Sequence, residues 1–352
     1  MFRPPRAAKR QTGAVYYCFA LLVLPNDAAA MYEWLLRPST RLVGTFISLL
    51  LAAPLLWSYY EWRHFSTRFN RLHEEKLSHR RSEGRIPPII HQSWKSRSRI
   101  PAKFAPYVRS WRQHHPTWTY LFWDDEENIA LIRIRFPQYY QMAQKLPKVA
   151  LADFTRYAIM FEIGGVYADL DFESLKPFDA LISDTRYAEG VVISSEPLAH
   201  TVLLNGRREG DPNGRLTLCN AILLSRPGHV FWLKLMETIY TTFTTTVERD
   251  AVSLTGPRMV QRVWKSFFSN DSTVSVLPEE YFYPEVAYWN RENMDKDCAR
   301  RNDSLAREAC AGLAAFPKGH YTQNTHAVHH WECTWCRHKE GKETVDLSKI
   351  FV

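Results

Sequence analysis

The sequence predicts an α/β domain built on a mainly parallel β-sheet, and three observations indicate it. Short apolar runs typical of strands alternate with longer segments whose apolar residues recur at helical spacing. Gly164-Gly165 separates one such helix from a short apolar strand. That strand ends in Asp169-Leu170-Asp171, and in open α/β sheets ligands bind beyond the carboxyl ends of the strands.

The predicted elements follow in order from Ile86, where the folded part is expected to begin. Strands are expected at 87–94, 118–123, directly after Gly165, at 191–194 and at 221–224. Helices are expected at 128–136, 148–163 and 231–243. Pro137 ends the first helix, and Gly164 ends the second in the manner usual for a helix C-terminus.

The amino-acid composition limits the classes of protein to which this chain can belong. The chain has 352 residues, of which 45% are hydrophobic and 23% charged, as in a folded protein with one large domain or two smaller ones. Its net charge is +8, but no basic stripe with interleaved aromatic residues stands out. We therefore expect no nucleic-acid partner. The positive charge suits an anionic lipid surface or a phosphorylated substrate.

Residues 42–60 form a run of nineteen amino acids without a charged side chain. Such a run is long enough to cross a bilayer as one helix. Trp57, Tyr59 and Tyr60 cluster at one end of it, as aromatic side chains do at membrane interfaces. We predict a single transmembrane helix here, and a buried core helix is the alternative.

The predicted transmembrane helix divides the chain into the segments before and after it. We expect residues 1–41 to be a cytoplasmic tail or N-terminal extension, 61–85 a polar stem, and 86–352 the folded lumenal domain. Arg37 and Arg41, before the anchor, favour a cytoplasmic N-terminus and hence a single-pass type II protein. The apolar run 14–24 leaves two interpretations open, a second membrane segment or a start of translation at Met31.

Cysteine usage agrees with a lumenal domain. Four cysteines are expected in loops, Cys298 and Cys310 in one polar loop and Cys333 and Cys336 near the C-terminus. They can form two disulfides, whose pairing the sequence leaves open. Cys219 is expected to be single and buried. A zinc site at Cys333-x-x-Cys336 with a nearby histidine is the alternative, although a second Cys-x-x-Cys pair is absent.

Four residues form the pattern that suggests a chemical role. They are Asp153 and Arg156, in Asp-x-x-Arg, and Asp169 and Asp171, in Asp-x-Asp. Asp169 comes thirteen residues after Arg156. Asp153 and Arg156 share one helix face because they are three residues apart. Asp169 and Asp171 repel each other unless a cation lies near them. Mg²⁺ and Mn²⁺ take oxygen ligands and often link a carboxylate to a substrate's phosphates. The pattern predicts a metal that holds a diphosphate, and the alternative for Asp153 and Arg156 is a local ion pair, which contributes little to stability when exposed.

The residues from Ile86 to Asp179 resemble glycosyltransferase family 32, the DXD sugar-transferase family. Three runs bear the resemblance: IPPIIHQSWKS, LFWDDEEN and ALADFTRYAIMFEIGGVYADLDFESLKPFD. Weaker matches follow at Asn220-Ala221, at Thr255-Gly256-Pro257 and at His329-His330-Trp331-Glu332-Cys333-Thr334-Trp335. Members of this family include inositol-phosphoceramide mannosyltransferases and initiation-specific α1,6-mannosyltransferases.

The resemblance implies a GT-A-type nucleotide-sugar-binding fold and roles for particular residues. The implied catalytic residues are Asp169, Asp171, Asp153 and Arg156. The implied substrate-binding residues are Trp94, Asn220, Thr334 and Trp335. The implied metal is Mn²⁺ or Mg²⁺, held by Asp171, Asp169 and His330. Arg156 is expected to neutralise a phosphate, and Asp153 to orient the donor sugar.

The function implied is that of a metal-dependent, retaining glycosyltransferase in the Golgi membrane. It would move a hexose from GDP-mannose or a UDP-sugar to a glycolipid or glycan acceptor, with mannosylation of inositol phosphoceramide among the candidate reactions. The alternative is a noncatalytic membrane protein with the same fold that binds a glycan or nucleotide.

Overall fold

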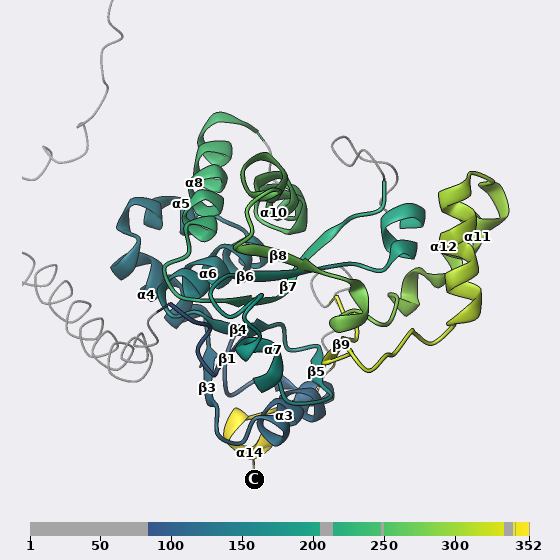
Figure 1. Cartoon of the computed structure of the whole chain (residues 1–352). Coiled ribbons are helices and arrows are strands. Elements are labelled where there is room, and N and C mark those ends of the chain that lie inside the picture. Colours follow the sequence, from purple (N-terminus) through teal and green to yellow (C-terminus); the bar gives the residue numbers. More distant parts are fainter. Residues whose placement is uncertain (1–83, 205–213, 248–249, 334–340, 342, 352) are drawn as a thin grey trace, which may run out of the picture. The chain divides into compact units, whose positions relative to one another are not determined.

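A computed structural model describes residues 84–204, 214–247, 250–333, 341 and 343–351 (Figure 1). They belong to one unit, Arg68–Val352. The predicted tail, anchor and stem lie outside the described residues, apart from the last two residues of the stem. None of the described helices is long and apolar enough to span a membrane.

The centre of the fold is a six-stranded sheet with the order β3-β1-β4-β7-β6-β8. Its strands are β1 Ile89–Ser93, β3 Thr119–Trp123, β4 Gly165–Ala168, β6 Val191–Ser195, β7 Leu218–Ser225 and β8 Val274–Leu277. The pairs β1–β3, β1–β4 and β6–β8 are parallel, whereas β7 runs antiparallel to β4 and β6. Five of these six strands share one direction, which confirms the α/β domain with a mainly parallel sheet.

Helices cover both faces of the sheet (Figure 1). Successive strand residues point to opposite faces, so Ile89 packs in one apolar cluster and Ile90 in the other. The first cluster lies under α4 Asp125–Arg135, α5 Tyr140–Ala143, α6 Lys148–Glu162, α8 Val230–Thr245, α9 Ala251–Leu254 and α10 Pro257–Val263. The second lies under α3 Ala105–His114 and α7 Asp179–Ser183. Burial on both faces explains why the strands read as apolar runs.

Two short antiparallel ladders flank the main sheet. In the first, β5 Phe172–Ser174 pairs with β9 Ala327–His329, and Phe172 lies opposite His329. In the second, β2 Ile100–Pro101 pairs with β10 Thr344–Val345, which is followed by α14 Leu347–Ile350. The first ladder matters most, because it brings a C-terminal segment beside the residues that follow Asp171.

The predicted helices and strands are all present, with shifted boundaries. The helix expected at 128–136 begins at Asp125, because Asp124 and Glu127 form a capping box at its start. The strand expected at 221–224 begins three residues earlier, at Leu218. The helix α3 was not among the predicted elements; Pro106 stands in its first turn, a position that tolerates proline.

The Gly164-Gly165 turn needs glycine for two separate reasons. Both residues have positive φ angles, +71° and +103°, which side chains disfavour. A Cβ atom on Gly164 would lie 2.6 Å from the carbonyl oxygen of Ser225, and one on Gly165 would lie 2.5 Å from that of Ile89. The close contact of these backbones fixes where β4 begins, and Asp169 directly follows the last residue of this short strand.

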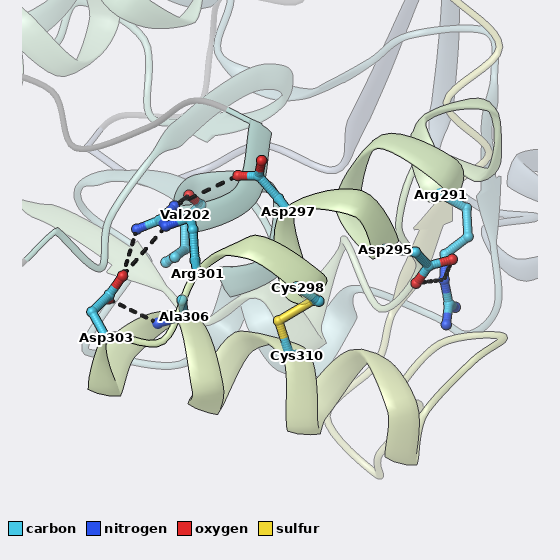
Figure 2. The surroundings of a disulfide bond; sticks show 9 residues. All are labelled: Val202, Arg291, Asp295, Asp297, Cys298, Arg301, Asp303, Ala306 and Cys310. Atoms are coloured by element: carbon cyan, nitrogen blue, oxygen red, sulfur yellow. Dashed lines mark hydrogen bonds and ion pairs between the residues drawn. A yellow bond between two sulfur atoms is a disulfide. The ribbon is translucent and has the colours of Figure 1, made fainter.

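Cys298 and Cys310 lie on two helices, which corrects the expectation of one polar loop. Cys298 is on α11 Arg291–Arg300, Cys310 is on α12 Ser304–Ala315, and a disulfide joins them (Figure 2). The polar composition misled because α11 is an exposed helix with ion pairs one turn apart, such as Arg291 with Asp295. Asp303 accepts a hydrogen bond from the Ala306 amide and begins α12.

The remaining cysteines are accounted for in the described part of the chain. Cys219 is buried and free, as expected. Cys333 is disulfide-bonded. A thiol in a disulfide cannot serve as a thiolate ligand, so Cys333 does not form the alternative zinc site.

Replacing both Cys298 and Cys310 by Ala is expected to lower the free energy of unfolding by about 2–4 kcal/mol, because a disulfide restricts the unfolded chain. Equilibrium denaturation of the double variant and of wild type measures this. Cys219→Ala, which leaves the disulfide intact, is the control. Equal stability of the double variant and wild type would contradict the prediction.

Candidate functional site

A cavity of about 1120 Å³ opens at the carboxyl ends of the parallel strands. Its wall includes Trp94, Asp169 and Glu196, which directly follow β1, β4 and β6, and Asp171, two residues after Asp169. Because β7 runs in the opposite direction, its first half supplies Asn220 to the same edge. This is the edge at which open α/β sheets bind ligands. The volume is that of a site for a large ligand.

Asp169 is held by Arg156 across the base of the cavity. Two nitrogens of the guanidinium lie 3.2 and 3.3 Å from the two carboxylate oxygens, and the Tyr167 hydroxyl donates to Oδ1 at 3.1 Å. Burial raises the pKa of Asp169, the charge of Asp171 adds to this, and Arg156 opposes it. Arg156 also donates to the Asn220 carbonyl at 2.7 Å, so it is a buried structural cation as well as a partner of Asp169.

Asp171 faces His329 and the segment that follows it. The distance from His329 Nε2 to Asp171 Oδ1 is 3.1 Å, and the Glu332 amide donates to Oδ2 at 2.9 Å. Burial alone would raise the pKa of Asp171. The charge and hydrogen bond of His329, with the Glu332 amide, outweigh burial, and the pKa lies below its ordinary value. Asp171 is therefore a carboxylate at neutral pH.

Asp153 belongs to a buried network rather than to a surface ion pair. Its Oδ1 accepts from the Asn220 side-chain amide at 2.9 Å and lies 3.3 Å from Arg156. Its Oδ2 accepts from the Thr255 hydroxyl at 3.0 Å. Burial raises the pKa of Asp153 to about 6, although Arg156 opposes the shift. Asp153 thus links α6, β7 and the turn before α10.

The raised pKa of Asp153 predicts a pH dependence of stability. Between about pH 4 and about pH 6 the native state retains a proton on Asp153 that the unfolded chain, with its ordinary value of 3.8, has lost. The native state therefore loses stability as the pH rises through this window, by at most about 1.4 kcal/mol per unit. Asp153→Asn does not titrate and is the reference.

Thermal unfolding of wild type and Asp153→Asn from pH 4 to pH 7 tests this. The unfolding temperature of wild type is expected to fall relative to that of the variant as the pH rises to about 6. Above that pH the difference between the two unfolding temperatures is expected to stay constant. A difference that is independent of pH would show that the Asp153 carboxyl titrates as an ordinary exposed one.

The structure also locates the other residues named from the sequence. The Trp94 side chain lines the cavity and donates to the Arg99 carbonyl at 3.1 Å. His330 turns away from Asp171: its Nε2 lies 3.0 Å from Glu173, and its ring stacks on Tyr107 with centroids 4.1 Å apart. Thr334 and Trp335 lie outside the described residues. The His329 side chain, and not that of its neighbour His330, therefore contacts the Asp171 carboxylate, whereas the His330 amide donates to the Asp171 carbonyl at 2.9 Å.

Three cavity residues escaped the sequence interpretation: His329 as the contact of Asp171, Glu196 and Trp331. His329 occupies the last position of β9, opposite Phe172, and only this long-range register decides which histidine of the pair points to Asp171. Glu196 comes two residues after the strand predicted at 191–194, so its place near a strand end was an available signal. Trp331 stands in the family match at 329–335, but no role was assigned to it from the sequence.

The donor set fits a divalent cation in part. A carboxylate and an imidazole in contact, Asp171 and His329, supply two ligand atoms of the types that Mn²⁺ accepts. Both oxygens of Asp169 are engaged by Arg156 and Tyr167. Among the described residues, no group of three or more His, Cys, Asp or Glu side chains is arranged to hold a metal. A cation here needs further oxygens from water or from a bound phosphate.

Comparison with known proteins gives a family match in the middle of the chain. Residues 101–188 match the family described as the glycosyltransferase sugar-binding region containing DXD motif. This stretch runs from the end of β2, through α6 with Asp153 and Arg156, past Asp169 and Asp171, to α7. The residues that form the base of the cavity are thus the family's defining region, and the resemblance stated from the sequence is confirmed.

Individual relatives are distant. Inositol phosphoceramide mannosyltransferase 1 of Schizosaccharomyces pombe is 31% identical over 121 residues, 33% of this chain and 37% of that protein. The initiation-specific alpha-1,6-mannosyltransferase of Saccharomyces cerevisiae is 24% identical over 204 residues, 49% and 42% of the two chains. This chain thus spans less than half of either relative. The solved galactosyltransferase LgtC is 11% identical with a TM-score of 0.40, over 72% of this chain and 93% of that one.

Proposed function

We propose that this protein is a glycosyltransferase that moves a hexose from a nucleotide-sugar to a glycolipid or glycan acceptor. One observation supports this above the others: the DXD carboxylates lie at the base of a cavity large enough for a donor and an acceptor together. The donors that we propose are GDP-mannose or a UDP-sugar. The mannosyltransferase names of the distant relatives favour the former, with inositol phosphoceramide among the candidate acceptors.

In this proposal Asp171 and His329 would hold Mn²⁺ or Mg²⁺. The cation would neutralise the negative charge that develops on the leaving diphosphate. Asp169 is kept in place by Arg156 and Tyr167 and faces the donor. Asp153 and the Asn220 carbonyl hold the guanidinium of Arg156 in place. Because Arg156 in turn binds Asp169, these two residues help to position the Asp169 carboxylate.

We further propose that the protein is anchored in the Golgi membrane by residues 42–60 as a single-pass type II protein, with residues 86–352 in the lumen. The uncharged run and its aromatic end support this, as does the disulfide between α11 and α12, since disulfides persist in oxidising compartments. Protease protection of the domain in intact Golgi vesicles tests the orientation. Cleavage of the domain without detergent would overturn it.

A panel of GDP- and UDP-sugars, incubated with the full-length chain and Mn²⁺, tests the catalytic proposal. Slow hydrolysis of one donor, released as nucleoside diphosphate and free hexose, is expected even without an acceptor. Calorimetric titration with GDP and UDP in the presence of Mn²⁺ runs beside it. Nucleotide binding without turnover of any donor, with or without glycan acceptors, would favour the noncatalytic alternative.

A further inference from the structure

A row of side chains connects Asp171 to a second carboxylate in the same cavity. Asp171 contacts His329, as described above. The His329 and Trp331 ring centroids are 4.3 Å apart, and those of Trp331 and His200 are 4.5 Å apart. His200 Nδ1 lies 3.2 Å from Glu196 Oε2. Trp331 therefore stands between the DXD side of the cavity and Glu196.

Trp331 is held in place at an energetic cost. Its φ is +52°, in the left-handed region that residues other than glycine rarely adopt. Two hydrogen bonds keep it there: its indole Nε1 donates to the Glu285 carbonyl at 2.8 Å, and its own carbonyl accepts from Trp289 Nε1 at 2.7 Å. Such strain persists only where surrounding contacts impose it, and it concentrates at functional sites. The contacts of Trp331 thus present its ring to the cavity.

Glu196 is an oriented carboxylate. The Ala287 amide donates to His200 Nε2 at 2.9 Å, and a backbone N–H can only donate, so Nε2 is the unprotonated nitrogen. We therefore assign the ring proton to Nδ1, which donates it to Glu196 Oε2. Within the described residues, Glu196 Oε1 has no hydrogen-bond partner, and the side chain is only 12% exposed. One oxygen is fixed, and the other is available to a ligand.

The chemistry of the pair points to a sugar. We propose that Trp331 and Glu196 form a pyranose-binding subsite, in which the indole face packs on the C–H face of a sugar ring and Glu196 Oε1 accepts hydrogen bonds from its hydroxyls. An aromatic side chain provides apolar contact area with little loss of freedom, and a carboxylate is a strong acceptor for neutral hydroxyls. A diphosphate would be repelled by Glu196, so the subsite takes the sugar part of a ligand.

The pyranose has two sources, the hexose of the donor or a sugar of the acceptor. This inference rests on the proposed glycosyltransferase function, and the two reactions of such an enzyme separate the sources. Donor hydrolysis needs the donor hexose alone, whereas transfer needs both. A subsite for the donor hexose affects both reactions, and a subsite for the acceptor affects transfer alone.

Glu196→Gln and Trp331→Ala in the full-length chain test the subsite, with Trp331→Phe as a variant that retains an aromatic face. Controls are Glu237→Gln on the outer side of α8 and Phe267→Ala, a ring that is 56% exposed outside the cavity. We expect kcat/KM for sugar transfer to fall at least about 10-fold in both Glu196→Gln and Trp331→Ala. For Glu196→Gln this is the effect of weakening a hydrogen bond to a charged group. Trp331→Phe should fall less, and the controls should match wild type.

The Kd for GDP or UDP with Mn²⁺ should change less than about twofold, because the proposed subsite binds the sugar and not the diphosphate. Unchanged kcat/KM in Glu196→Gln and both Trp331 variants would overturn the subsite. So would a loss of nucleoside diphosphate binding as large as the loss of kcat/KM. If Trp331→Ala does not fold, judged by circular dichroism, then Glu196→Gln and Trp331→Phe decide.

Sugar binding itself separates this inference from the proposed function. Saturation-transfer NMR with methyl α-hexopyranosides is expected to detect ring protons in contact with wild type and to lose them in Glu196→Gln. Absence of contact in wild type would overturn the subsite, whether or not any donor is turned over. Contact without turnover would support the subsite and refute the transferase.

Discussion

Asp171→Asn is expected to lower kcat for sugar transfer at least about 100-fold while the protein unfolds within a few degrees of wild type. The amide oxygen of Asn can still accept the hydrogen bond that the Glu332 amide donates to Asp171 at 2.9 Å, so the local backbone stays in place. The substitution removes the negative charge of the Asp171 carboxylate, which lies 3.1 Å from His329 Nε2 and would attract a cation. Removal of one group that stabilises developing charge typically costs this much in rate.

Turnover of the donor at saturating Mn²⁺, and thermal unfolding of the same preparation, measure the two halves of this prediction. Asp184→Asn is the matched control, because Asp184 is paired with the exposed Arg186 and lies outside the cavity wall. Turnover by Asp171→Asn within about threefold of wild type would contradict the role given to Asp171. A large loss of stability would instead identify Asp171 as a structural residue.

Arg156→Met is expected to lower the free energy of unfolding by about 3–5 kcal/mol. The guanidinium is buried and contacts the carboxylates of both Asp153 and Asp169. Methionine fills a similar volume but leaves both acids without a cation, and an uncompensated buried charge is strongly destabilising. Adding Asp153→Asn to Arg156→Met is expected to recover part of the loss, since one of the two unpaired charges is then removed.

Chemical denaturation of the single and double variants measures these changes. Arg291→Met is the control: Arg291 pairs with Asp295 on the exposed face of α11 (Figure 2), and such pairs contribute less than about 1 kcal/mol. A loss for Arg156→Met no larger than that of Arg291→Met would contradict the buried network. Equal loss in the single and double variants would show that Asp153 is not its unpaired partner.

Local pattern predicted much of the base of the site correctly. The spacing of three residues between Asp153 and Arg156 places both on one face of α6, and they form an ion pair at 3.3 Å. The Gly-Gly turn predicted where β4 begins, and Asp169 directly follows the last residue of that strand. These features depend on residues close in sequence, whose geometry the backbone periodicities determine.

The partners of these residues could not be predicted in the same way. The guanidinium of Arg156 contacts Asp169 and the Asn220 carbonyl as well as Asp153, while its expected role toward a phosphate stays a prediction. Which of these contacts form depends on how β7 pairs with β4, whose paired residues are 54 to 60 positions apart in sequence. A helix face can be read from spacing, but the group opposite that face cannot.

The sequence by itself determined the α/β class, the helix with Asp153 and Arg156, and the pair of carboxylates at a strand end, because these follow from short-range periodicity and turn chemistry. Only the tertiary structure decided that His329 and not His330 meets Asp171, and that Trp331 and Glu196 share the cavity. A shift of one residue in the pairing of β9 with β5 would exchange the two histidines. Such registers are set by packing between distant segments, which no local pattern records.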